Sequence, residues 1–329
     1  MRAGIVGRGF IAGVHAQALQ ALGVEVAWHA GRGDDLGALL DRDRVDVLHV
    51  CTPNDVHCAQ ALAAIGRGVH VVCEKPLAVS TAECEALVGA AEEAGVVHAV
   101  CYHVRGYPLV EHMRAEVAAG ALGELTFVHG RYLCDDVLFP ASGWRTDPER
   151  SGPSYVVGDL GTHWLDLAEH VTGQHVVETL ADFRSFAGGP LEDYAALLLR
   201  FDGGAAGSLV LSAGAAARKN QLLFELEGRA AGFTWDQETP TEALFRPVDA
   251  PRQVVVKDPL ANAASARPLA RYPAGHGEGY GGAFRNLFEA VYDAVWGLPH
   301  APFPTFRDGA RGVATVEAAV RSRGTWVTI

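Results

Sequence analysis

The first hundred residues alternate between short apolar runs and stretches in which apolar residues recur at helical spacing. The apolar runs predict five strands, at 2–6, 24–30, 45–51, 69–73 and 96–101. Helices are predicted at 10–22, 56–65 and 81–94, and the short segment before residue 46 predicts a curtailed second helix. Strands that are apolar on both faces and alternate with helices indicate a parallel sheet covered on both sides. Because crossovers between parallel strands are right-handed, we expect a doubly wound α/β (Rossmann) domain over residues 1–102.

The pattern changes after residue 102. Helices are predicted at 108–118, 158–170, 279–296 and 308–321, and strands at 125–132, 176–186, 194–201, 205–213, 221–227 and 232–235. Most of these strands follow one another directly, and Asp202-Gly203-Gly204 is typical of a hairpin turn. Such strands indicate a mainly antiparallel open sheet, so residues 103–329 are expected to form an α+β domain. The Pro- and Ala-rich stretch 249–276 is expected to be a long surface connection.

Size and charge narrow the class of protein. A chain of 329 residues exceeds the usual limit for one hydrophobic core, and 49% hydrophobic with 20% charged residues is ordinary for a globular protein. The 27 basic and 39 acidic residues give a net charge of −12 without a basic cluster, which argues against nucleic acid as a partner. No apolar window is long enough for a membrane helix, and glycines interrupt the N-terminal MRAGIVGRGF, which argues against a secretory signal. We therefore expect a cytoplasmic protein with no membrane partner.

Cysteine and histidine usage gives no sign of a metal site or a disulfide framework. The six cysteines form no Cys-x-x-Cys pair, and several lie in apolar runs such as VLHVC and VHVVC. Free cysteines packed as small hydrophobic residues in a reducing cytosol explain this pattern most simply. No His-x-x-x-His or Cys/His cluster has the spacing of metal ligands, so no metal is expected.

A glycine-rich motif, Gly7-Arg8-Gly9-Phe10-Ile11-Ala12, joins the first predicted strand to its helix. Gly7 permits a tight turn, Gly9 lets a pyrophosphate approach the backbone, and the small residue at the sixth position lets helix and strand pack closely. The start of the helix, at Phe10 and Ile11, offers free N–H groups to the phosphates. The motif predicts dinucleotide binding; the alternative is glycines that serve helix–strand packing alone.

The end of the second predicted strand bears on cofactor choice. NAD-specific domains usually place an acidic residue there to bind the ribose 2′-hydroxyl. Here the segment Trp28-His29-Ala30-Gly31-Arg32 contains no acidic residue, and the first one is Asp34. Arg32 suits a 2′-phosphate better than a hydroxyl. The cofactor is therefore expected to be NAD(P) with a modest preference for NADP, unless Arg32 is only a solvated loop residue.

Two further groups could carry chemistry. Glu74-Lys75-Pro76 directly follows a predicted strand, and ligands of doubly wound sheets bind at the carboxyl ends of strands, so Lys75 could stabilise charge on a substrate oxygen. Asp159 and His163 are four residues apart at the start of a predicted helix, where a carboxylate can orient a histidine that exchanges protons near neutral pH. A surface ion pair and a helix cap are the alternatives for the two groups.

In this order, these segments resemble the Gfo/Idh/MocA family of sugar and cyclitol dehydrogenases over essentially the whole chain. The resemblance rests on the motifs GIVGRGFIA, VDVLHVCTPNDVH, VHVVCEKPL, RGYP with GALGEL, GDLGTHWLD, HGEGYGGAFRNLFEAV and PTFRDGARGV. It implies hydride transfer at a ring carbon, with Lys75, Asp159 and His163 as the catalytic set. His163 would exchange the proton, Asp159 would orient it, and Lys75 would bind the substrate oxygen.

The resemblance also implies binding residues. Thr52, Pro53, Asn54 and His57 match the family's loop beside the nicotinamide ribose, and Glu74 and Lys75 match cofactor contacts. Arg105, Trp144, Arg145 and His276 fall in segments that bind substrate in relatives. The chain is shorter than the family pattern between residues 24 and 46.

The expected open sheet also bears on assembly and on rival functions. Its strands include the apolar segments AALLLRF and GSLVLSA, and an exposed apolar face of that size is unusual for a monomer. Two such faces would pair about a two-fold axis, so a homodimer or homotetramer is expected. A non-catalytic nucleotide-sensing regulator of the same fold and an NAD-dependent glycoside hydrolase are the alternatives to a simple dehydrogenase.

Overall fold

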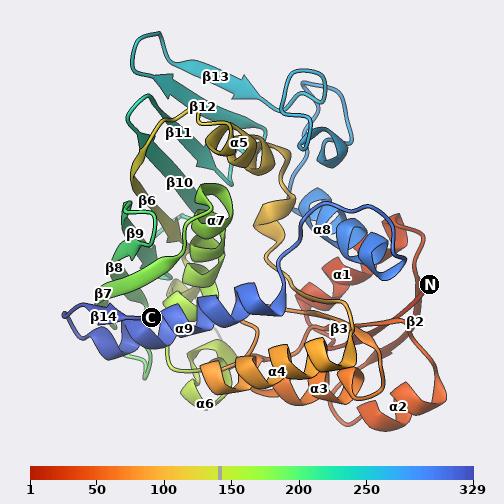
Figure 1. The fold of residues 1–329 in the computed structure, drawn as a ribbon. Coiled ribbons are helices and arrows are strands. Elements are labelled where there is room, and N and C mark those ends of the chain that lie inside the picture. Colours follow the sequence, from red (N-terminus) through yellow and green to blue (C-terminus); the bar gives the residue numbers. More distant parts are fainter. Residues whose placement is uncertain (140–142) are drawn as a thin grey trace. The chain divides into compact units, whose positions relative to one another are not determined.

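The computed structural model describes residues 1–139 and 143–329 and divides the chain into two compact units (Figure 1). The first unit consists of Met1–Gly106 and Tyr280–Val313, and the second of Tyr107–Gly279 and Ala314–Ile329. Helix α9 (Phe306–Ser322) therefore begins in the first unit and ends in the second. Among the described residues, no helix is both long and apolar enough to cross a membrane.

The first unit contains a five-stranded parallel sheet in the order β2-β1-β3-β4-β5. Its strands are β1 (Arg2–Val6), β2 (Glu25–Ala30), β3 (Val47–Val50), β4 (His70–Cys73) and β5 (His98–Val100). The strand order reverses between β1 and β3, which is the point where doubly wound sheets bind ligands. The predicted Rossmann-type fold is confirmed.

Helices cover both faces of this sheet. They are α1 (Phe10–Ala21), α2 (Leu36–Arg42), α3 (His57–Ile65), α4 (Thr81–Ala94) and α8 (Tyr280–Val295). On one face, apolar residues of α1 and α8 share a core with β1, and on the other face α3, α4 and the start of α9 share a second core with the sheet. The expected shortening of the second helix agrees with α2, which has seven residues.

The position of α8 differs from the expected division of the chain at residue 102. Phe284, Leu287, Phe288 and Val291 of α8 are buried in the core that contains α1 and β1, so this late helix belongs to the first unit. Burial of its apolar side chains explains this placement, which depends on packing between segments far apart in the sequence.

The second unit contains a nine-stranded sheet in the order β13-β12-β11-β10-β6-β9-β8-β7-β14. The strands are β6 (Leu125–Leu133), β7 (Val176–Arg184), β8 (Tyr194–Phe201), β9 (Ala206–Ser212), β10 (Gln221–Gly228), β11 (Ala231–Asp236), β12 (Glu242–Pro247), β13 (Gln253–Val256) and β14 (Val327–Thr328). All neighbouring pairs are antiparallel except β6 and β9, so the predicted sheet type is confirmed. The predicted hairpin at Asp202-Gly203-Gly204 joins β8 to β9.

One face of this sheet carries helices. α7 (Thr162–Thr172) contacts β6 and β10, and α5 (Pro108–Ala118) packs against α7 (Figure 1). The short α6 (Pro148–Ser151) precedes α7. On β8 and β9 every second residue faces away from the buried side, and Leu198 is 48% and Val210 38% exposed. The single chain therefore has an apolar strip open to solvent.

Candidate active site

The glycine-rich turn after β1 has the shape of a phosphate cradle. Gly7 has φ +115°, and a Cβ at this position would lie 2.2 Å from the carbonyl oxygen of Cys51, so a side chain is excluded there. Gly9 is the N-cap of α1, and nothing lies within 4 Å of the position its Cβ would occupy. The first turn of α1 contains no acidic residue, so its unpaired N–H groups at Phe10 and Ile11 can bind an anion. These observations fit the pyrophosphate of a dinucleotide.

The carboxyl end of β2 brings together charges that the sequence alone did not connect. The carboxylate of Asp34 accepts a hydrogen bond from the N–H of Gly31 at 2.7 Å and pairs with Arg8 at 3.3 Å. Arg32 is exposed beside them. The Asp34 carboxylate thus lies at the end of β2, although no acidic residue occurs within residues 28–32. The short Gly31–Asp34 turn was the local signal for this contact.

The loop after β3 is tied to the loop after β4 by His57. The Nε2 of His57 lies 2.9 Å from the carbonyl oxygen of Thr52, and its Nδ1 lies 3.0 Å from that of Pro76. Burial lowers the pKa of His57 below its ordinary value, although both carbonyls favour the protonated ring. His57 therefore positions these loops through backbone contacts. Thr52 and Pro53 are partly buried beside it, and Asn54 is buried.

Lys75 lies at the carboxyl edge of the sheet, directly after β4. Its side chain is partly exposed, and the Lys75–Pro76 peptide bond is cis. The neighbouring Glu74 is buried and turns back into the unit, where its carboxylate accepts from the Lys75 N–H at 3.1 Å and contacts His15 Nε2 at 3.0 Å. Burial raises the pKa of Glu74, but the hydrogen bond and charge of His15, with the charge of Lys75, outweigh it and lower the pKa overall. Glu74 is thus an ionised anchor beside Lys75.

Asp159 and His163 lie in the second unit, where a π-helical turn, Val157–Gly161, leads into α7. Turns of this kind are frequent at functional sites. His163 is buried in the first turn of α7, and its ring centroid lies 6.1 Å from that of Tyr132. Asp159 is partly buried. Asp159 thus lies on the π-helical turn, and His163 follows it at the start of α7.

The surroundings of Asp159 are strongly charged. Arg145 lies 3.4 Å from the Asp159 carboxylate, and its guanidinium lies 5.0 Å from the centre of the Trp144 ring. Burial and then the negative charge of Asp159 raise the pKa of Asp136, while Arg145 opposes this effect. Burial and the same charge raise the pKa of Tyr155. Asp136 and Tyr155 therefore belong to this cluster, although no spacing in the sequence indicated them.

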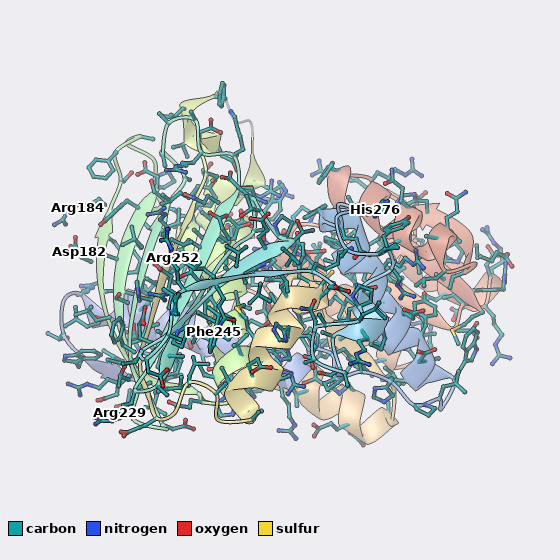
Figure 2. The ribbon with its side chains drawn as sticks, turned by 90° about the horizontal axis from the view of Figure 1, so that it is seen from above. Asp182, Arg184, Arg229, Phe245, Arg252 and His276 are labelled. Carbon is teal, nitrogen blue, oxygen red and sulfur yellow. The ribbon has the colours of Figure 1, made fainter. Side chains whose placement is uncertain are left out.

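The other two predicted substrate residues have different surroundings. Arg105, in the first unit, pairs with Asp308 at 3.0 Å and is mostly buried. His276, in the second unit, is exposed, and its Nδ1 lies 3.4 Å from the carbonyl oxygen of Ala274 (Figure 2).

Side chains able to bind a metal do gather at one place in the described part of the chain. His15, Glu74 and Cys101 are buried in the first unit with their ligand-type atoms within 4.8 Å of one another. No motif spacing indicates this cluster, because its members are far apart along the chain. All six cysteines are free, as expected.

Comparison with known proteins identifies the family. Residues 20–102 match the model of an oxidoreductase family with an NAD-binding Rossmann fold, and residues 110–234 match the C-terminal domain of the GFO/IDH/MocA family. An uncharacterized oxidoreductase, YfiI, of Bacillus subtilis is 30% identical over 304 residues, which span 85% of this chain and 76% of the relative.

Two relatives have more specific names. The levoglucosan dehydrogenase of Pseudarthrobacter phenanthrenivorans is 29% identical over 257 residues, covering 70% of this chain and 66% of the relative. The crystal structure of an inositol dehydrogenase homolog with NAD+ from Azotobacter vinelandii superimposes with a TM-score of 0.93 at 31% identity, covering 100% of this chain and 97% of the other. The resemblance inferred from the motifs is confirmed: the chain belongs to the Gfo/Idh/MocA family of NAD-binding oxidoreductases.

Proposed function

We propose that the protein is an NAD(P)-dependent dehydrogenase that transfers a hydride to or from a ring CH–OH or ketone group of a sugar, cyclitol or sugar derivative. The observation that carries the proposal is the placement of Asp159 on the π-helical turn and of His163 at the start of α7, with Arg145 at 3.4 Å from Asp159. A histidine beside a carboxylate exchanges protons near neutral pH. The named relatives, a levoglucosan dehydrogenase and an inositol dehydrogenase homolog, support the substrate class.

Each residue of the catalytic set has one task in this proposal. Nicotinamide supplies the acceptor or donor of the hydride. His163 takes the proton of the substrate hydroxyl during oxidation and returns it during reduction, and Asp159 orients the imidazole. Lys75 donates a hydrogen bond to the same substrate oxygen and stabilises its developing negative charge.

Substrate hydroxyl groups need several directional donors and acceptors. Arg145 has a planar guanidinium that remains partly exposed while it pairs with Asp159, and Trp144 lies against it. We assign these two residues, with Arg105 and His276, to substrate binding. The ion pair between Arg105 and Asp308 also gives Arg105 a structural task.

The cofactor choice depends on three charged residues at the end of β2. Arg8 and Arg32 would bind a 2′-phosphate, whereas Asp34 would accept a hydrogen bond from a ribose hydroxyl and repel a phosphate. Because Arg8 pairs with Asp34 and the exposed Arg32 adds a second cation to this segment, we propose a modest preference for NADP(H).

The open face of the second sheet supports self-association. The side chains of Leu198 and Val210 project from the apolar strip on β8 and β9, while Asp182 and Arg184 of β7, visible in Figure 2, pair with each other at 3.0 Å. An apolar strip with a charged margin suits a self-complementary interface. We propose a homodimer or homotetramer, and the six free cysteines favour a reducing compartment such as the cytoplasm.

The function is tested by incubating the purified protein with NAD+ or NADP+ and a panel of sugars, inositols, anhydrosugars and keto-sugars, with absorbance at 340 nm as the readout. Cofactor reduction with a cyclic polyol, lost in His163→Ala, is the expected result. Release of a free sugar from a glycoside without net cofactor reduction would instead indicate a glycoside hydrolase. Tight cofactor binding without turnover of any panel member would favour the regulator.

A further inference from the structure

Four buried side chains of the first unit form a continuous hydrogen-bonded chain that begins at Glu74. The carboxylate of Glu74 lies 3.0 Å from His15 Nε2, and His15 Nδ1 lies 2.9 Å from His49 Nδ1. The chain continues from His49 Nε2 to the hydroxyl of Tyr292 at 3.0 Å. All four residues are almost completely inaccessible to water. They come from four separate elements, namely α1, β3, the end of β4, and α8.

The carboxylate of Glu74 fixes the direction of the first of these hydrogen bonds. An ionised carboxylate only accepts, so His15 Nε2 must carry a proton and donate it to Glu74. The two Nδ1 atoms of His15 and His49 share one proton, and His49 Nε2 shares another with the Tyr292 hydroxyl. Burial, followed by the neighbouring His15, lowers the pKa of His49 well below its ordinary value, which agrees with a neutral ring.

Aromatic side chains enclose the histidines. The ring centroid of His15 lies 4.7 Å from that of Phe288 and 5.6 Å from that of Phe284, and His49 lies 4.9 Å from Phe288. Glu74 does not need water as a hydrogen-bond donor, because His15 donates to one of its carboxylate oxygens and the Lys75 N–H donates to the other. If His15 were removed, the buried charge of Glu74 would lack one of its hydrogen-bond donors, which is strongly unfavourable.

We propose that His15 is a positioning residue that fixes Lys75 by holding the carboxylate of Glu74. One oxygen of Glu74 binds His15, on the second turn of α1, and the other binds the backbone N–H of Lys75. The same helix begins at the glycine-rich turn that fits the pyrophosphate. The His15–Glu74 bond thus couples the phosphate-binding helix to the segment that carries Lys75. This inference rests on the proposed function only for the role of Lys75.

The same cluster can be read as a metal site, because His15, Glu74 and Cys101 are ligand types for zinc. The hydrogen-bond reading explains more of the geometry: it also accounts for the contacts of His15 Nδ1 with His49 and of His49 with Tyr292. A single metal ion bound at His15 Nε2 would not explain the His15–His49 and His49–Tyr292 contacts. Elemental analysis of the purified protein separates the two readings, and one zinc per chain would overturn ours.

The primary test measures the segment that carries Lys75 without relying on any substrate. Amide hydrogen exchange over residues 74–77 is compared in the wild-type protein with cofactor bound and in three variants. His15→Ala removes the donor, and exchange should be at least about tenfold faster, as for loss of a supporting outer-shell contact. His15→Gln keeps an N–H at a similar distance and should restore exchange to within about threefold. His98→Gln alters another histidine of the unit, which accepts from the Phe306 N–H at 3.1 Å, and should leave residues 74–77 unchanged.

A second readout uses activity. In His15→Ala, kcat should fall about 10–100-fold while the Kd of the cofactor changes by less than about threefold, and His15→Gln should recover most of kcat. Glu74→Gln alone should lose activity similarly, and the double variant should be no worse than either single variant, because both act through one contact.

The pH profile gives a further readout. The titratable groups around Glu74 are His15 of α1 with its partner His49 of β3, Cys51 after β3, His57 of α3, Cys73 of β4, and Lys75, Cys101 and His103. With His15 removed, burial raises the pKa of Glu74, so the acidic limb of kcat/KM should move to higher pH in His15→Ala and return to its wild-type position in the double variant with Glu74→Gln.

These outcomes decide the inference separately from the function. Unchanged exchange at 74–77 in His15→Ala, or an equal increase in His98→Gln, overturns the positioning role even if the enzyme is a dehydrogenase. Faster exchange restored by His15→Gln supports the role even if no panel substrate is oxidised, and in that case the proposed function alone fails.

Discussion

The ion pair between Arg105 and Asp308 leads to a prediction about stability that separates a structural role for Arg105 from a role in substrate binding. Asp308 lies in the first turn of α9, where its carboxylate accepts from the N–H of Thr305 at 2.7 Å and from its hydroxyl at 2.6 Å, as in a capping box. Arg105 and Arg311 add donors at 3.0 and 2.7 Å. The side chain of Arg105 is 10% and that of Asp308 17% exposed, so solvent screens the pair only weakly.

The remaining donors set the magnitude for Arg105→Ala. Thr305 and Arg311 still satisfy Asp308, so the loss is about that of one hydrogen bond to a charged group, roughly 1.5–3 kcal/mol of unfolding free energy. Asp308→Ala removes the helix cap and leaves Arg105 mostly buried without this carboxylate, so it should cost more, about 3–5 kcal/mol. The double variant should cost less than the sum of the two, with a coupling energy of about 1–3 kcal/mol.

The assay is denaturant unfolding of the wild-type protein, the two single variants and the double variant, with circular dichroism as the signal. Burial raises the pKa of Asp308, but the charge of Arg105 and the hydrogen bonds from Thr305 outweigh it and hold the pKa below its ordinary value. The ionised Asp308 carboxylate therefore contributes fully to the unfolding free energy above its pKa in the unfolded chain, about 4. This contribution is lost as pH falls below that value toward the pKa of Asp308 in the folded protein. In Arg105→Ala, the unfolding free energy should fall less steeply than in the wild-type protein as pH is lowered through that range. The reasoning would be refuted if Arg105→Ala left the unfolding free energy unchanged and the effects of the two substitutions were additive. Arg105 would then have only a catalytic or substrate-binding role.

Four further outcomes follow from the site and the open sheet. Lys75→Ala and His163→Ala should each lower turnover at least about a hundredfold with cofactor binding retained, as measured by kcat and by fluorescence titration; near-normal turnover of either folded variant would remove its catalytic role. Gly7→Ala should weaken cofactor binding and lower the melting temperature, because its Cβ would lie 2.2 Å from a backbone oxygen at φ +115°; unchanged values would contradict the cradle. Arg32→Ala should shift the ratio of the NADPH and NADH dissociation constants toward NADH, and an unchanged ratio would exclude its role in the preference. Leu198→Lys should dissociate the assembly in light scattering, whereas a wild-type protein of monomeric mass would refute the interface.

Features set by local sequence were predictable. Apolar runs on both faces of short strands indicated the parallel sheet, and the spacing of Gly7 and Gly9 indicated the turn that the structure shows. The strands β12 and β13 were not predicted. Most residues of β13 are exposed and its segment is rich in proline and alanine, and β12 has one buried residue, so neither segment shows a clear apolar period.

The part of the site that escaped prediction depends on contacts between distant segments. His15 meets Glu74 across 59 positions and His49 meets Tyr292 across 243, so no motif spacing could connect them. Asp34 was recognised as the first acidic residue after the second strand, but its return to the end of that strand depends on the turn conformation. Asp136 joins Asp159 only through the folding of β6 and α7 into one unit.

The late return of α8 to the first unit has a consequence for synthesis of the protein on the ribosome. When Met1–Gly106 has emerged, the face of the sheet that carries α1 still lacks Phe284, Phe288 and Val291. The whole of Tyr107–Gly279 must be translated first, which takes on the order of 10–30 s at ordinary rates of elongation. During that interval His15 and His49 have no aromatic enclosure, and the nascent chain presents an apolar surface suited to a chaperone. The dinucleotide-binding unit therefore begins before the second unit along the chain but is completed only after Tyr107–Gly279.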